Sequence, residues 1–180
     1  MNDSVHEIFE IDGTQIGRDQ PCYIIAEIGI NHNGDIEIAK KLIDSAIQIG
    51  ANAVKFQKRN LESIYQKELL DQPSLDSQGT EILIDVLKEV EFSEEDFLKI
   101  KQYCEEKKIT FLCTPWDIPS VNFLEKLDVS AYKIASADLT NLPLISYIAN
   151  LKKPLIISTG MSVMEEIEKT VNFVKEKQIQ

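Results

Sequence analysis

Residues 23–30, YIIAEIGI, form a short apolar run that contains a single charged side chain. A run of this kind is typical of a strand buried on both faces of a parallel sheet. Over residues 35–49 apolar side chains recur at helical spacing, and Gly50 follows as a stop signal. Residues 53–57, AVKFQ, form the next apolar run. This part of the chain therefore predicts a strand, a helix and a second strand.

The same order repeats along the rest of the chain. Residues 60–79 are a long polar excursion, in which we expect one helical turn. A helix start at Ser93, with acidic residues after it, precedes the predicted helix at residues 97–107. Further strands are predicted at residues 110–113, 131–134 and 154–157, and further helices at residues 82–90, 119–127, 142–151 and 164–176.

Five strand–helix units predict an α/β fold with a parallel sheet, either a doubly wound sheet or a (β/α)8 barrel. No glycine-rich phosphate loop follows the first strand, and every predicted strand ends in polar residues, which favours the barrel. Five strands cannot close a barrel, so we expect the later strands to belong to a longer chain or to another chain. Asp12 and Gly13 predict a hairpin, so residues 1–20 form a cap and residues 21–180 a partial barrel domain.

Composition narrows the classes of function. The formal net charge is −11, and no basic run is present, so we expect neither nucleic-acid nor membrane-surface binding. No apolar stretch could span a bilayer, and the first residues do not resemble a signal peptide. The odd number of cysteines (Cys22, Cys104 and Cys113) predicts free thiols in a reducing cytoplasm, with a catalytic cysteine as the weaker reading.

Two lysines occur inside predicted strands, Lys55 in AVKFQ and Lys133 in AYKIASAD. Because strand side chains alternate, Lys55 points away from Val54 and Phe56, which in a barrel can mean inward. Two lysines aimed at one cavity would bind a phosphate or a carboxylate. The alternatives are an interior lysine paired with a core carboxylate, and a lysine that forms a Schiff base.

Other polar residues lie at the predicted strand ends. Glu27 could bind sugar hydroxyls, act as a base or neutralise Lys55. Residues 31–35, NHNGD, form either a tight turn or a substrate-contacting loop; the glycine comes too early for a calcium loop. Hydroxyl groups suited to a phosphate follow the later strands, at Thr114, Ser136, Ser158 and Thr159, and Gly160 adds backbone freedom.

Five segments together carry a resemblance to a known family: residues 25–35, 55–57, 114–115, 133–141 and 158–161. In order and spacing they resemble the sialic acid synthases, which make N-acetylneuraminate, legionaminate or pseudaminate. The resemblance runs from about residue 8 to the end of the sequence. Asp138 stands where many members have glutamate, and Trp116 stands where phenylalanine is common. Both differences could alter the sugar preference.

The resemblance implies a (β/α)8 barrel that condenses phosphoenolpyruvate with an N-acetylated hexosamine and releases phosphate. It assigns catalytic roles to Glu27, Lys55 and Asp138, and it assigns substrate binding to Asn31, Gln57, Thr114, Trp116, Lys133, Ser136 and Ser158. It also implies Mn²⁺ or Mg²⁺ with histidine ligands in later strands, a C-terminal antifreeze-like domain and a homodimer. His6 and His32 are the two histidines here, and neither replaces those ligands.

Two other functions remain open at this point. One is a Schiff-base aldolase that uses Lys55 or Lys133. The other is an inactive fragment that binds anions. For the 180-residue chain alone we expect little or no synthase activity.

Overall fold

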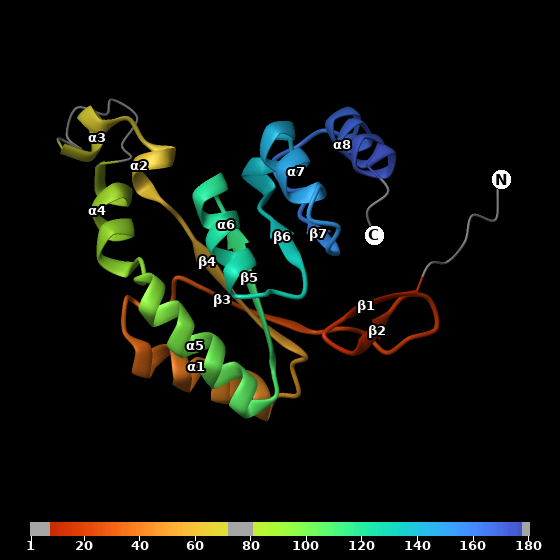
Figure 1. Cartoon of the computed structure of the whole chain (residues 1–180), viewed down its shortest axis with the longest axis horizontal. Helices are drawn as coiled ribbons and strands as arrows, with labels where there is room; N and C mark the ends of the chain where they lie inside the picture. The colour runs from red at the N-terminus through yellow and green to blue at the C-terminus, as the bar shows by residue number, and fades with distance from the viewer. Residues whose placement is uncertain (1–7, 72–80, 178–180) are drawn as a thin grey trace.

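The computed structural model describes residues 8–71 and 81–177. Near its start, β1 (Phe9–Ile11) and β2 (Thr14–Ile16) pair in antiparallel fashion around Asp12 and Gly13. Both turn residues have positive φ, +50° and +78°, as a two-residue hairpin turn requires. This pair forms a sheet of its own, near the N-terminus in Figure 1.

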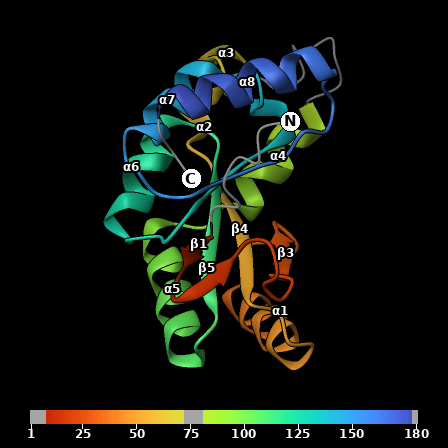
Figure 2. The same cartoon turned by 90° about the vertical axis from the view of Figure 1, so that its right-hand side faces the viewer.

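The remaining strands are parallel. Hydrogen bonds pair β3 with β4 and β4 with β5 in one sheet, and β6 with β7 in a second sheet. The two sheets meet where β6 lies next to β5. Helices alternate with these strands in the chain, and Figures 1 and 2 show them around the strands. The strands are β3 (Ile25–Gly29), β4 (Ala53–Lys58), β5 (Thr110–Pro115), β6 (Tyr132–Ile134) and β7 (Leu155–Ile157). The helices are α1 (Ile36–Gln48), α2 (Leu61–Ile64), α3 (Lys67–Asp71), α4 (Glu81–Val90), α5 (Glu94–Lys107), α6 (Ile118–Lys126), α7 (Leu142–Ala149) and α8 (Met164–Glu176), with a 3-10 turn η2 (Ser136–Asp138) before α7.

Polar side chains cap the helices that follow the strands. Asp35 accepts hydrogen bonds from the backbone N–H groups of α1, and Asp117 and Asn141 do the same for α6 and α7. Ser93 and Asp96 form a reciprocal capping box at the start of α5. Because the strands run parallel, the carboxyl ends of paired strands lie at the same edge of the sheet, and the capped helices α1, α6 and α7 begin after these ends.

The two faces of the strands pack against different partners. Val54 and Phe56 of β4 point to the large core beneath the helices, together with α5 and α6, whose Phe97 and Phe123 rings lie 6.0 Å apart. The other face holds a smaller apolar cluster at the amino ends of the strands, made of Ala53, Leu112 and Ala131. Ile11 of the hairpin joins this second cluster and is fully buried. The hairpin therefore packs on the amino ends of the parallel strands.

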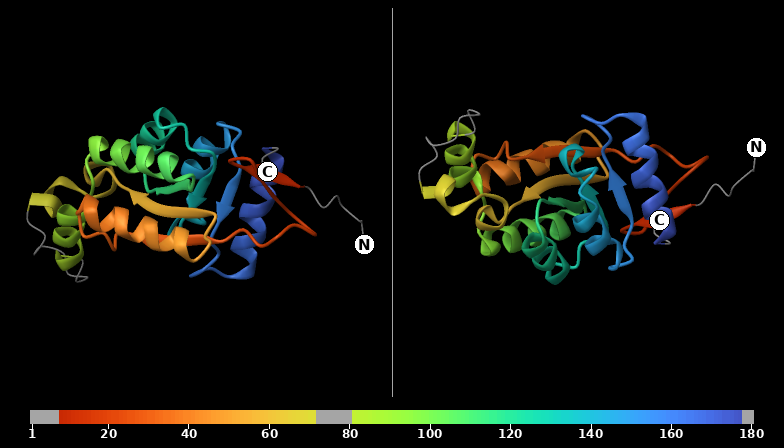
Figure 3. Two further views of the ribbon diagram at one scale, coloured as in Figure 1. Left: turned by 90° about the horizontal axis from the view of Figure 1, so that it is seen from below. Right: turned by 90° about the horizontal axis from the view of Figure 1, so that it is seen from above.

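The excursion after β4 differs from the sequence-based expectation. Instead of one helical turn, the described part contains two short helices, α2 and α3, before residues 72–80, which lie outside the described residues. Asn60 caps α2 by accepting from Ser63, a local signal that an apolar-periodicity analysis does not detect. Figure 3 shows α2, α3 and α4 grouped at one end of the molecule. Within the described ranges, none of the helices has the length and apolar character needed to cross a membrane.

Candidate functional site

We call the face of the parallel strands opposite Val54 and Phe56 the inner face. Along this face the side chains change from apolar to polar. At the amino end this face carries Ala53 and Leu112, which belong to the small apolar cluster. Two residues further along the same strands it carries Lys55 and Thr114. The alternation of strand side chains therefore places the polar groups together at the carboxyl ends, the end at which barrel enzymes hold their substrates.

Lys55 is a buried cation of this site. Its residue is 4% exposed, and its Nζ lies 2.9 Å from Glu27 Oε2 and donates to Thr114 Oγ1 at 3.1 Å. These three side chains come from β3, β4 and β5, so the lysine joins three neighbouring strands. As the alternation predicts, Val54 and Phe56 face the opposite core.

Lys133 repeats this arrangement on the next two strands. Its Nζ donates to Ser158 Oγ at 2.5 Å and to the Ile134 carbonyl at 3.0 Å. Burial and the charge of Lys55 both lower the pKa of Lys133, and Glu27 opposes them. The strand neighbours of Lys133, Tyr132 and Ile134, belong to the same core as Val54 and Phe56, so strand alternation places Lys133 on the same face as Lys55.

Ser136 and Gly160 approach each other beside Lys133 and Ser158. A Cβ atom on Gly160 would lie 2.9 Å from Ser136 Oγ, closer than such contacts normally come. The glycine therefore makes room for the Ser136 hydroxyl. The neighbouring Thr159 is exposed.

Glu27 neutralises Lys55, one of the three roles considered for it. The Glu27 side chain nevertheless remains 57% exposed. The carboxylate is therefore accessible from solvent at the carboxyl end of β3, while the lysine beneath it is not.

The NHNGD loop is a tight turn around a buried histidine. His32 is 1% exposed, its ring stacks on Phe92 at 3.9 Å, and its Nδ1 accepts from the Gly34 N–H. Asn31 is exposed, and its backbone N–H donates to the Ile28 carbonyl. The turn interpretation of this loop thus accounts for His32, and substrate contact by Asn31 stays a prediction.

The pKa of His32 makes stability depend on pH. Burial lowers this pKa from 6.5 to about 4. Between these two pH values the unfolded state binds a proton on His32 and the folded state does not. Stability is full above pH 6.5 and is lost as the pH falls towards 4. Between pH 7 and pH 5 we expect the free energy of unfolding to fall about 2 kcal/mol more than in His32→Asn. Urea unfolding of both chains at the two pH values measures this difference; equal losses would contradict it.

Asp138 lies apart from the lysine contacts, in a pocket of about 460 Å³ between α2, α6 and α7. Trp116 and Asn141 also line this pocket, and Asn141 Nδ2 donates to Asp138 Oδ1 at 2.9 Å. Asp138 Oδ2 and Trp116 Nε1 are buried, with no partner among the described residues. Burial and the nearby charge of Asp117 raise the pKa of Asp138. A carboxyl group with a raised pKa is suited to exchanging a proton.

Sequence analysis missed three residues at the end of β4 and beyond it. Lys58 Nζ forms an ion pair with Glu91 at 3.0 Å, and the Arg59 backbone N–H donates to the same carboxylate oxygen at 3.1 Å. Glu91 thus joins the two ends of the excursion. Arg59 is only 8% exposed, and its side chain donates to Gln57 Oε1. Two consecutive cations at the end of a buried strand, Lys58 and Arg59, were the available signal.

The buried thiols of Cys104 and Cys113 do not support a catalytic cysteine. Burial raises the pKa of Cys104 to about 12 and raises that of Cys113 further, so both remain protonated at neutral pH. A protonated thiol is a poor nucleophile. Cys22 is exposed and free.

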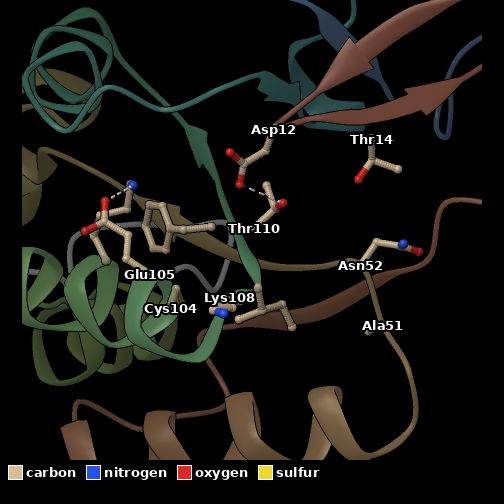
Figure 4. A pocket seen from close by; sticks show the side chains of 11 residues that line it. Asp12, Thr14, Ala51, Asn52, Cys104, Glu105, Lys108 and Thr110 are labelled. Carbon is tan, nitrogen blue, oxygen red and sulfur yellow. Dashed lines mark hydrogen bonds and ion pairs between the residues drawn. The ribbon is translucent and has the colours of Figure 1, made fainter.

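Another pocket, of about 540 Å³, lies at the opposite ends of β4 and β5 (Figure 4). Its polar groups are largely paired with one another. Asp12 accepts from the Thr110 hydroxyl at 3.0 Å, and Lys101 pairs with Glu105. The amino ends of barrel strands usually serve stability, so we assign this pocket no catalytic role.

Metal binding is not supported by the described residues. Residues 8–71 and 81–177 contain no group of three or more His, Cys, Asp or Glu side chains that could hold a metal ion together. His32, with its ring stacked and its Nδ1 engaged, is unsuited to the task.

Comparison with known proteins shows a consistent set of relatives. The model of the NeuB family matches residues 42–180. The N,N'-diacetyllegionaminic acid synthase of Legionella pneumophila is 37% identical over 161 residues, 88% of this chain and 45% of that protein. The chain spans about half the length of the curated relatives it matches.

Solved structures show similar folds. The N-acetylneuraminic acid (sialic acid) synthetase of Leptospira borgpetersenii, solved with citrate, has a TM-score of 0.83 and 33% identity, covering 97% of this chain and 57% of that one. A phospho-2-dehydro-3-deoxyheptonate aldolase of Thermotoga maritima reaches a TM-score of 0.68 at 12% identity, covering 97% and 44% of the two chains. The second likeness concerns the fold alone. Both support an α/β fold with parallel strands.

Proposed function

The chain belongs to the NeuB family, and from that premise we propose that the complete protein condenses phosphoenolpyruvate with an N-acetylated hexosamine, such as N-acetylmannosamine. The products are a nonulosonic acid of the sialic type and phosphate. One observation carries the proposal: two lysines on one inner face, Lys55 and Lys133, each donate to a hydroxyl group at the end of the following strand. The names of similar synthases support it.

The proposed fold of the complete protein is a closed eight-stranded (β/α)8 barrel. Strands β3 to β7 would form five of its eight strands, and the hairpin would cap the amino ends. The packing of Ile11 against Ala53, Leu112 and Ala131 supports the cap. The remaining strands and the C-terminal antifreeze-like domain would lie outside this chain.

The lysine side of the site would hold phosphoenolpyruvate. This substrate carries a phosphate and a carboxylate, and Lys55 and Lys133 supply two fixed positive charges for them. Thr114 and Ser158 orient the two ammonium groups, and Ser136 adds a third hydroxyl. Charges that are already in place when substrate arrives stabilise an anionic transition state without reorganising.

The part of the site that holds the carboxylates of Glu27 and Asp138 would bind the sugar. Glu27, exposed at the end of β3, can accept hydrogen bonds from sugar hydroxyls, and Asn31 and Gln57 lie on the same edge. Asp138, with its raised pKa, is proposed to exchange a proton with the reacting atoms. Trp116 would contact the sugar from the Asp138 pocket.

In the proposed reaction, carbon three of phosphoenolpyruvate forms a bond to the sugar aldehyde carbon. Water adds its oxygen to carbon two, and the bond between carbon two and the phosphate oxygen breaks. One water proton goes to the former aldehyde oxygen, and the other leaves with phosphate. The lysines counter the negative charge of the phosphate throughout.

Further properties of the complete protein are proposed from the family resemblance. We propose a homodimer that works in the cytoplasm without nucleic acid or membrane partners. We also propose a requirement for Mn²⁺ or Mg²⁺. Since the described residues do not fit a metal site, we assign no step to the ion.

The test is to incubate the complete protein with phosphoenolpyruvate and N-acetylmannosamine or a diacetamido hexose, and to measure phosphate and nonulosonic acid. We expect both products in equal amounts, and little or none from residues 1–180 alone. Phosphate without the acid would contradict condensation. Robust phosphate release by residues 1–180 alone would contradict the expected inactivity of the chain.

A second candidate function is a Schiff-base aldolase. The lowered pKa of Lys133 favours it, because a neutral amine attacks carbonyl groups. Borohydride added with pyruvate separates the two functions, since it would reduce a lysine imine to a stable secondary amine. For the condensing enzyme we expect no increase in protein mass. A pyruvate adduct on Lys55 or Lys133 would favour the aldolase instead.

A further inference from the structure

Arg59 is the first residue after β4, and it lies buried between two groups of the candidate site. Its guanidinium carbon lies 4.4 Å from the centroid of the Trp116 ring. Its Nη2 donates to the side-chain oxygen of Gln57, the residue two positions earlier. Arg59 thus contacts two predicted substrate-binding residues.

The chemistry of the guanidinium determines the orientation of the Gln57 amide. Arginine carries donors and no acceptor, so it can pair with Oε1 of the glutamine and not with Nε2. With Oε1 held, the Nε2 group points away from Arg59. It lies beside Gly29, where a Cβ atom would come within 3.2 Å of Nε2. The Gln57 amide therefore presents its donors at the carboxyl ends of β3 and β4, on the same edge as Glu27.

The surroundings of Arg59 hold it in this position. Its backbone N–H donates to Glu91. The backbone N–H of Trp116 donates to the Lys58 carbonyl at 3.1 Å, which extends the pairing of β4 and β5 beyond the strand ends. The indole that supports the guanidinium is thus fixed by the same backbone. Arg59 Nη1 is buried and has no partner among the described residues, so no acceptor there draws the guanidinium away from Gln57.

We infer that Arg59 is a positioning residue that locks the Gln57 amide with its N–H groups towards the substrate, which makes Gln57 a donor to a substrate oxygen. This inference rests on the proposed function, because it concerns the same site. It adds a residue with no direct substrate contact and a defined hydrogen-bonding sense for Gln57. A carbonyl or hydroxyl oxygen of the sugar is the acceptor that the position of Gln57 beside Glu27 favours.

The first test needs no activity. In ¹⁵N-labelled residues 1–180, the side-chain N–H₂ signal of Gln57 is identified by its absence from Gln57→Ala. We expect it to be as ordered as the backbone in the unaltered chain, with an order parameter near 0.85, and to fall below about 0.6 in Arg59→Met. Lys99→Met, which removes an exposed cation of α5, is the matched control and should leave the signal unchanged. An equally ordered Gln57 amide in Arg59→Met would overturn the inference.

The second test uses kinetics of the complete protein. We expect Arg59→Met to lower kcat/KM for the amino sugar by roughly 10- to 100-fold, since loss of orientation alone can have that effect. The double variant Arg59→Met/Gln57→Ala should be within about threefold of Gln57→Ala alone, because the arginine acts through the glutamine. Losses that multiply in the double variant, or unchanged kinetics in Arg59→Met, would overturn the inference.

Arg59→Lys is the control that separates a loss of positioning from a folding defect. It keeps the positive charge but has no planar fork to stack on Trp116 and reach Gln57. We expect the Gln57 side-chain amide to be mobile in this variant also. The unfolding midpoint of the variant should be close to that of the unaltered chain. If the complete protein condenses no substrate while the Gln57 amide is rigid and depends on Arg59, then the proposed function fails and the positioning role stands.

Discussion

Replacing Lys55 with methionine in the complete protein is expected to lower kcat/KM for phosphoenolpyruvate about 1,000-fold, equivalent to about 4 kcal/mol of lost transition-state stabilisation. Methionine matches the apolar stem of lysine up to Cε and removes the ammonium group. Lys55 is 4% exposed, and its ammonium group is held between Glu27 and Thr114, so water cannot readily replace the lost charge. Steady-state kinetics with both substrates varied measure the change.

The same substitution should leave the fold intact. Glu27 remains 57% exposed, so water can solvate the carboxylate that loses its partner. We therefore expect the free energy of unfolding to change by less than about 1 kcal/mol, because removal of a buried charge offsets the lost ion pair. Lys99→Met serves as the surface control for kinetics. A Lys55→Met enzyme with nearly normal kinetics would show that this lysine only neutralises Glu27.

The largest effect on stability is expected from Gly34→Ala. Gly34 has a φ of +73°, and a Cβ atom there would lie 2.6 Å from the backbone oxygen of Glu89. The obstructing atom belongs to the backbone of α4 and cannot swing aside as a side chain would. Adding this clash to the strain of positive φ, we expect a loss of about 3 kcal/mol in the free energy of unfolding.

Gly50→Ala is the matched control for Gly34→Ala. Its φ of +77° is nearly the same, but nothing lies within 4 Å of the added Cβ. Strain alone should then cost about 1 kcal/mol. Urea unfolding of the two variants and the unaltered chain isolates the contact with α4. Equal destabilisation by both substitutions would show that the NHNGD turn does not press against Glu89.

Much of the site could be predicted from alternation within strands. The placement of Lys55 opposite Val54 and Phe56 followed from the two-residue period alone, and the same rule accounts for Lys133 and Ser158 on one inner face. These positions are local consequences of the strand backbone. For that reason a single sequence sufficed to predict them.

Features that depend on contacts between distant parts of the chain could not be predicted from the sequence in the same way. Arg59 contacts Gln57, Trp116 and Glu91, and the last two come from segments far along the sequence. His32 could be seen as a loop histidine, but its burial depends on Phe92, which lies sixty positions later. Neither periodicity nor a local motif carries such information, because these contacts arise only when the strands assemble.

The claim that Lys55 and Lys133 form one anion site can be tested most directly by a crystal structure of the complete protein with phosphoenolpyruvate. We predict one bound molecule whose phosphate and carboxylate oxygens lie within hydrogen-bond distance of both Nζ atoms, with the Thr114 and Ser158 hydroxyls beside them. A molecule that contacts neither lysine, or one bound in the pocket between Asp12 and Lys108, would contradict the account.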